Sequence, residues 1–70
     1  MKLICKADGV PTPNLTWKNP SGNVIHQLIG FKNMVDVLMS SDQDFGHYTC
    51  EATNDFDTDA STVLVQQISK

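Results

Sequence analysis

Basic residues are scarce in this 70-residue chain, which has no arginine and only five lysines. The lysines are scattered, none lies between residues 33 and 69 where aspartates accumulate, and the net charge is −3. Nucleic-acid-binding surfaces cluster their cations, and helices that lie on anionic membranes carry a basic face. The composition therefore argues against nucleic acid and against direct membrane contact, and we expect a protein partner.

Long apolar segments are also lacking. No segment approaches the roughly 20 apolar residues of a membrane-spanning helix, and residues 1–8 lack the apolar run of a secretory signal. We therefore expect neither a membrane span nor a secretion signal within these residues.

Catalytic signatures are missing as well. No serine, cysteine or lysine stands in a recognisable nucleophile motif, and we interpret the two histidines, His26 and His47, as surface residues. The two cysteines lack the CxxC spacing of zinc sites and thioredoxin-like centres. We predict that the chain is not an enzyme and binds no cofactor or metal.

One acidic segment approaches a metal-binding pattern. Asp55, Asp57 and Asp59 alternate like the first ligands of a calcium loop. Ala60 stands where that loop has glycine, and Gln66 stands where it has the closing glutamate. We favour a solvated acidic turn that serves recognition, with calcium binding as the weaker alternative.

The sequence does contain a period-two alternation of apolar residues, broken by segments dense in Gly, Pro, Asn and Asp. This alternation predicts short strands joined by turns. The predicted strands cover residues 2–8, 15–18, 35–38, 46–53 and 60–66, with turns at 9–14, 19–23 and 54–59. The side chains expected to point inward include Leu3, Cys5, Ala7, Tyr48, Cys50, Ala52, Val63 and Val65, whereas Ile4 and Leu64 point outward. The apolar run at residues 24–31 stays unassigned.

The spacing of a few residues is the most informative feature. Trp17, the only tryptophan, follows Cys5 by twelve residues, and Tyr48 precedes Cys50 by two. Asp44 lies four residues before Tyr48 in the same alternation. The two cysteines allow one intramolecular pair, which would indicate an oxidising compartment, but two buried thiols in a reducing compartment also fit the count.

This spacing resembles the intermediate-set immunoglobulin domains of neural cell adhesion molecules and related surface receptors. The resemblance implies an all-β, two-sheet antiparallel sandwich with Greek-key connections. It implies a disulfide between Cys5 and Cys50, with Trp17 packed against it. It also implies that Tyr48 is a corner tyrosine whose hydroxyl binds the backbone upstream, and that Asp44 belongs to the same structural core.

The resemblance covers strands B to G of the family, so strand A is missing. We therefore expect residues 1–70 to form one partial domain of a longer protein. Without strand A, the first strand would present an edge that can pair with another chain, which favours either an edge-strand dimer or instability.

Asn14, Leu15 and Thr16 form an acceptor triplet for N-glycosylation, which we place in an exposed turn. The triplet favours the secretory route. A glycan at Asn14 would shield that tip of the sandwich.

The predicted binding face is mixed and polar, as in many non-obligate interfaces. Its outward residues are Thr16, Lys18, His47, Thr49, Glu51 and Thr53. The resemblance implies an extracellular or cell-surface module of an adhesion or signalling receptor that mediates cell–cell recognition. The alternative is a structural module of an intracellular muscle-type filament protein with reduced cysteines, and titration of the thiols would distinguish the two.

Overall fold

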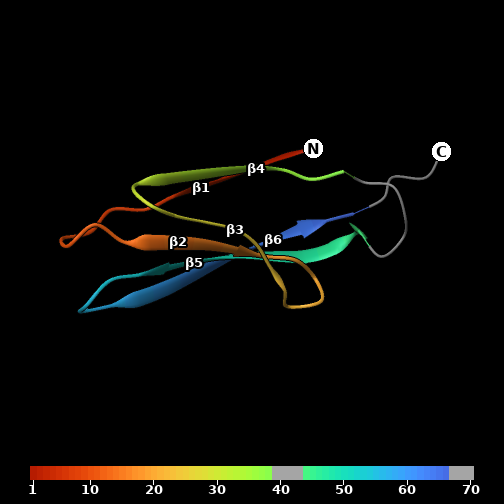
Figure 1. Ribbon diagram of the computed structural model, residues 1–70. Coiled ribbons are helices and arrows are strands. Elements are labelled where there is room, and N and C mark those ends of the chain that lie inside the picture. Colours follow the sequence, from red (N-terminus) through yellow and green to blue (C-terminus); the bar gives the residue numbers. More distant parts are fainter. Residues whose placement is uncertain (39–43, 67–70) are drawn as a thin grey trace.

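The computed structural model describes residues 1–38 and 44–66, which contain six β-strands and no α-helix (Figure 1). In chain order the strands are β1 (Lys2–Lys6), β2 (Asn14–Lys18), β3 (Val24–Ile29), β4 (Lys32–Asp36), β5 (Gly46–Thr53) and β6 (Thr58–Val65). All strand pairs are antiparallel. The prediction of an all-β fold is therefore confirmed.

The strands form two sheets. One has two strands in the order β1-β4, and the other has four strands in the order β3-β2-β5-β6. Figure 1 shows the β1-β4 pair lying as a separate layer beside β2, β5 and β6. The chain passes from one sheet to the other between β1 and β2, between β3 and β4, and between β4 and β5. The predicted two-sheet sandwich is confirmed.

Alternating side chains build the core between the sheets. In β1, Leu3 and Cys5 are buried while Ile4 is 51% exposed, and in β2 Leu15 and Trp17 are buried. Tyr48 and Cys50 of β5, the strand next to β2, are also buried on this inner side of the four-stranded sheet. Within residues 1–38 and 44–66 the buried apolar cluster consists of Leu3, Cys5, Leu15, Trp17, Tyr48, Cys50 and Val65. The period-two pattern thus located the buried side of β1, β2 and β5 correctly.

A disulfide joins the two layers. The Sγ atoms of Cys5 on β1 and Cys50 on β5 lie 2.03 Å apart, across a sequence separation of 45 residues. Neither cysteine is free. In a chain of this size, which buries only about 60% of its unfolded surface, a covalent link between the sheets supplements a small apolar core.

The apolar run at residues 24–31, for which no strand was predicted, is the largest difference between the sequence-based prediction and the structure. Residues 24–29 form β3, which pairs with β2, and β4 begins at Lys32, before the expected start of its strand at residue 35. Every residue of β3 except Leu28 is exposed, and β3 is an edge strand of its sheet. A strand with exposed residues on both faces has no apolar alternation to detect.

Three further expectations are corrected at residue level. Asn14 lies in β2 rather than in the preceding turn, and the β5–β6 connection is shorter than predicted because β6 begins at Thr58. Val63 was expected to be buried, but it is 39% exposed. Val63 does lie opposite Tyr48 on the inner side of its sheet, but at this position β6 is not covered, whereas Val65 at the end of the strand is buried. Leu64 points outward as expected.

Candidate functional site

Strand register gathers the six predicted binding residues on one side of the four-stranded sheet. Thr16 lies directly opposite Glu51, and Lys18 lies opposite Thr49. Residues that face each other across antiparallel strands project from the same side, and alternate residues of one strand do so too. The outer face, as we call it, therefore contains Thr16, Lys18, His47, Thr49, Glu51 and Thr53.

Side-chain contacts tie the outer face together. The Lys18 ammonium forms a salt bridge with the Glu51 carboxylate across β2 and β5. Gln27 Nε2 donates to Thr16 Oγ1 at 3.2 Å, and the hydroxyls of Thr49 and Thr62 lie 3.3 Å apart. Each of the four strands thus contributes to one connected polar surface.

Sequence reasoning missed Gln27 and Thr62 as members of this surface. Gln27 lies on β3, which had no assigned strand, and Thr62 lies opposite Thr49 on β6. A period-two count along residues 58–65 would have placed Thr62 on the outward side together with Leu64, whereas no sequence signal identified β3.

Exposed apolar residues flank the polar centre. Ile29 lies opposite Asn14 at one end of the face and is 74% exposed, and Leu64 lies opposite His47 at the other end and is 50% exposed. Non-obligate protein interfaces combine polar and apolar area in this way. The arrangement can support protein recognition without the continuous apolar area of an obligate dimer.

Asn14 belongs to the outer face. It is the first residue of β2 and lies between Thr53 of β5 and Ile29 of β3. Its Oδ1 atom is buried and has no hydrogen-bond partner among the described residues, whereas an N-linked glycan attaches through Nδ2. A glycan at this position would stand on the edge of the outer face, and the predicted position in an exposed turn is wrong.

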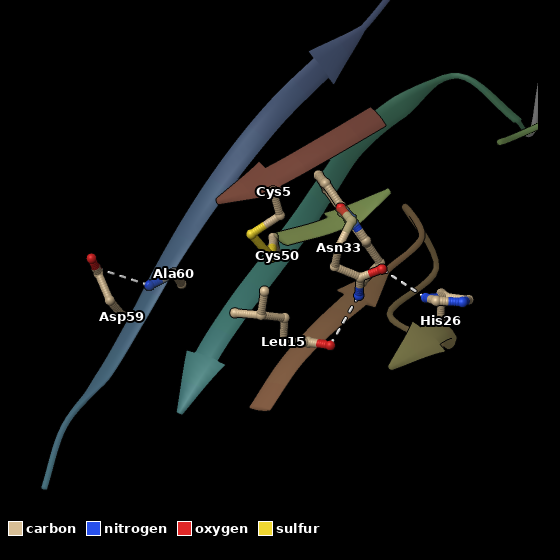
Figure 2. Close-up of a disulfide and its surroundings, with 8 residues drawn as sticks. Cys5, Leu15, His26, Asn33, Cys50, Asp59 and Ala60 are labelled. Atoms are coloured by element: carbon tan, nitrogen blue, oxygen red, sulfur yellow. Dashed lines mark hydrogen bonds between the residues drawn. A yellow bond between two sulfur atoms is a disulfide. The ribbon is translucent and has the colours of Figure 1, made fainter. Parts of the chain in front are cut away.

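A polar network crosses the core next to the disulfide (Figure 2). Asn33 of β4 is completely buried, and its Nδ2 donates to the Leu15 carbonyl at 3.0 Å. Trp17 Nε1 donates to the Asn33 carbonyl at 3.1 Å, so the buried indole retains a partner. His26 Nδ1 lies 2.7 Å from Asn33 Oδ1, and because an amide oxygen only accepts, the imidazole donates. Sequence reasoning missed Asn33 and treated His26 as an unconnected surface residue.

Tyr48 and Asp44 are connected through the backbone. The Tyr48 hydroxyl donates to the Asp44 carbonyl at 2.6 Å, four residues upstream, and Tyr48 is 2% exposed. Burial raises the pKa of the Tyr48 phenol, and the nearby negative charge of Asp44 raises it further. Both effects keep the phenol protonated, which preserves its role as the donor.

The acidic connection between β5 and β6 uses its side chains locally. Asn54 Oδ1 accepts from the N–H groups of Phe56 and Asp57, and the carboxylates of Asp57 and Asp59 each accept from the following N–H at 2.9 Å. In residues 1–38 and 44–66, no three His, Cys, Asp or Glu side chains lie close enough together to hold a metal ion. The geometry gives the calcium alternative no support.

Nowhere in the described part of the chain is there a helix long and apolar enough to cross a bilayer.

Comparison with known proteins shows that the chain is similar to segments of extracellular matrix proteins. The chain is 31% identical over 70 residues to hemicentin-2 of Mus musculus, covering 93% of this chain and 1% of that protein. It is 31% identical over 78 residues to matrix-remodeling-associated protein 5 of Homo sapiens, covering all of this chain and 3% of that protein. It is 28% identical over 67 residues to the basement membrane-specific heparan sulfate proteoglycan core protein of Mus musculus, covering 93% of this chain and 2% of that protein.

The chain therefore spans only a few per cent of the length of these relatives. They agree with the Cys5–Cys50 disulfide in confirming the expected extracellular or cell-surface location. A family model described as an immunoglobulin domain matches residues 1–54, which is more than half of the sequence. The chain belongs to the immunoglobulin-domain family.

Proposed function

We propose that this chain is a protein-binding module of a cell-surface adhesion or signalling protein, and that it recognises its partner through the outer face of β3-β2-β5-β6. The observation that carries the proposal is the register that aligns β2 with β5, which brings Lys18 beside Thr49 and Thr16 beside Glu51. We also propose assignment to the intermediate set, on the spacing of Cys5, Trp17, Tyr48 and Cys50.

The chemistry of the outer face supports a partner that binds reversibly. Lys18 and Glu51 are both partly exposed and already paired, so a partner can approach without stripping water from an isolated charge. Hydroxyl and amide groups such as Thr16, Gln27 and Thr49 supply hydrogen-bonding capacity, while Ile29 and Leu64 supply apolar contact at the two ends. No catalytic step is part of the proposal.

A bulky cation in the middle of the face tests the proposal. The chain would be displayed as a biotin-linked tetramer, and its binding to cultured adherent cells would be measured by flow cytometry. The same protein would be coated on beads of two colours, so that mixed clusters reveal binding between copies. Thr49→Arg should reduce whichever binding is observed by at least about tenfold, because central contacts dominate interface energies.

Thr12→Arg is the matched control, since Thr12 is exposed in the β1–β2 connection and lies outside the outer face. It should bind as the unmodified chain does. Equal binding by Thr49→Arg and the unmodified chain would contradict the proposal, and so would a larger loss from Thr12→Arg. Absence of both cell binding and bead clustering would also overturn it.

The alternative role in an intracellular muscle-type filament predicts reduced cysteines. The disulfide between Cys5 and Cys50 supports the extracellular role instead. Protein isolated from its natural source would be denatured and titrated with a thiol reagent. The extracellular role predicts no free thiol, whereas two free thiols would favour the filament role.

A further inference from the structure

Strand β3 forms an open edge of the four-stranded sheet. It pairs with β2 on one side, and no described strand pairs with its other side. Figure 2 shows the four strands next to one another, with β3 and its residue His26 at the end of the sheet away from β6. Only Gly30 and Phe31 separate β3 from β4 of the other sheet, and two residues leave no room for a further strand. The open edge is therefore set within this segment of the chain.

Backbone groups of β3 point to the open side at every second residue. The Gly30 N–H donates to the Pro13 carbonyl at 3.0 Å, which fixes the phase of the ladder between β2 and β3. In an antiparallel ladder, hydrogen-bonded residues alternate with residues whose peptide groups face the other edge. Leu28 therefore bonds to β2, whereas the N–H and C=O groups of Gln27 and Ile29 face the open side and can bond a further strand.

This edge lacks the features that keep strand edges apart. Residues 19–31 contain no Asp, Glu, Lys or Arg, and no proline lies in β3. Charged side chains, prolines and bulges are the usual protection of an edge strand. One register shift occurs between Trp17 and Lys18, opposite the start of β3, and the register from His26 to Ile29 is regular. Residues 26–29 are therefore an unprotected edge.

Large apolar side chains are exposed along and beside this edge. Val24, Ile29 and Phe31 are 55%, 74% and 53% exposed, and Ile25 is 37% exposed. Their concentration in residues 24–31 makes an apolar patch next to the open backbone groups, and such patches mark interaction sites. A neutral, apolar strand that pairs with β3 would bury this area and satisfy the backbone groups at the same time.

We propose that a second copy of this chain occupies the edge, and that the two β3 strands pair antiparallel about a two-fold axis at Gln27. In this register Ile29 of each copy lies opposite Ile25 of the other. Apolar residues therefore meet apolar residues, whereas a register centred on Leu28 would set each Ile29 opposite Gln27. The pairing uses β3, and not the first strand, at which the sequence-based expectation places an edge-strand dimer.

The central pair is compatible with itself. Gln27 Nε2 donates to Thr16 Oγ1 at 3.2 Å within its own chain. An amide group has two donors and a carbonyl acceptor, so Gln27 keeps one N–H and its Oε1 for the amide of the second copy. The two-fold contact uses the same edge on both copies, so it closes on itself and stops at two chains.

Pairing at β3 would join the two four-stranded sheets into one sheet of eight strands. Their order would be β6-β5-β2-β3 in one copy, followed by β3-β2-β5-β6 in the other. The two outer faces would lie on the same side of this sheet, because Gln27 projects beside Thr16 in each copy. Only the use of this enlarged face by a partner rests on the proposed function, whereas the pairing of β3 does not.

Sedimentation velocity and hydrogen exchange test the pairing directly. From about 10 µM to about 1 mM, the sedimenting species should change from one chain to two. Hydrogen exchange followed by NMR should slow with rising concentration at the amides of Gln27 and Ile29. The amides of Leu28 and Gly30 should be protected at every concentration, because they already bond to β2.

Charge placed at the two-fold axis provides the sharpest variants. Gln27→Lys and Gln27→Glu should each raise the dissociation constant of the dimer by at least about tenfold, because like charges would lie directly opposite each other. An equimolar mixture of the two should form a heterodimer at least about tenfold tighter than either variant alone. Circular dichroism would verify that both variants are folded, and either one by itself tests the loss of pairing.

Thr12→Lys is the matched control, because it adds the same charge at an exposed position of the β1–β2 connection. It should dimerise as the unmodified chain does. A chain that stays monomeric up to about 1 mM would overturn the proposal. Undiminished dimerisation of Gln27→Lys would overturn it as well, and so would concentration-dependent protection at the amides of a different strand edge.

Discussion

The imidazole of His26 donates to the buried side-chain oxygen of Asn33, with 2.7 Å between Nδ1 and Oδ1. His26 is exposed on β3 and Asn33 is completely buried on β4, so this contact links the two sheets across the edge of the sandwich. The Asn33 amide also donates to Leu15, and its backbone carbonyl accepts from Trp17. One buried amide therefore holds the register of β4 over β2 and β3.

Asn33→Ala should lower the free energy of unfolding by about 2–3 kcal/mol, because it removes two hydrogen bonds from a buried position and leaves a void. His26→Ala should cost about 1 kcal/mol, since it leaves the buried Oδ1 of Asn33 without its donor. Urea unfolding followed by Trp17 fluorescence measures both.

Gln27→Ala is the control for that pair, because Gln27 is an exposed neighbour of His26 and should change stability by less than about 0.5 kcal/mol. An Asn33→Ala protein as stable as the unmodified chain would show that the network does not contribute.

Replacing Cys5 and Cys50 together with alanine should cost about 4 kcal/mol, because the unfolded chain regains the freedom of a loop that spans a sequence separation of 45 residues. For so small a core, this loss should leave a large unfolded fraction at 37 °C. Thermal unfolding followed by circular dichroism measures this loss of stability in the double variant. The unmodified chain in a reductant that breaks the disulfide provides a second measurement. A loss below about 1 kcal/mol in both would contradict the expectation.

Tyr48 should make the fold sensitive to alkali. Its pKa is raised in the folded chain by burial and by Asp44, so the folded state holds the phenolic proton at a pH where the unfolded state has lost it. The resulting stability is fully present below the unfolded pKa of about 10 and is lost as the pH rises from there through the folded pKa.

Urea titrations between pH 8 and pH 12 on the unmodified chain and on Tyr48→Phe would measure this effect. The difference in stability between the two should be constant below about pH 10 and should shift in favour of Tyr48→Phe above it. Below pH 10 the phenylalanine variant should be less stable by about 1 kcal/mol, because it lacks the bond to the Asp44 carbonyl. A difference that stays constant over the whole range would contradict the prediction.

Asn14 should carry an N-linked glycan when the chain is expressed through the secretory pathway of animal cells. Intact-mass measurement before and after glycosidase treatment should reveal the added mass, and Asn14→Gln should abolish it. Thr16→Ser should retain it, since serine preserves the acceptor triplet. An unmodified mass for the chain itself would contradict the prediction.

The same glycan should weaken binding through the outer face, because Asn14 lies beside Thr53 and Ile29 on that face. Tetramers of the glycosylated chain and of glycosidase-treated chain would be compared in the cell-binding assay. Equal binding by the two forms would show that the glycan projects away from the face.

The inward or outward orientation of a side chain could be predicted from the sequence where one side of its strand packs against the core. Cys5, Trp17, Tyr48 and Cys50 follow a strict alternation because a strand presents successive side chains to opposite sides, and burial of one side imposes an apolar period of two. The same reasoning placed Lys18 and Glu51 on a shared outer side before any register was known.

The sequence could not reveal β3 or the burial of Asn33. Leu28 is the one residue of β3 that is partly buried, so no apolar alternation marks the strand. Asn33 is buried only because three partners from β2 and β3 satisfy its polar groups. Val63 shows the opposite case, because its apolar side chain has the correct orientation but no strand above it.

By itself, then, the sequence determined the strand alternation, the inner and outer sides of β1, β2 and β5, and the family spacing, because each depends on residues close together along one strand. Only the tertiary structure decided how far one sheet covers the other and which polar groups find buried partners. Those properties depend on pairing between residues distant in sequence, which no local pattern encodes.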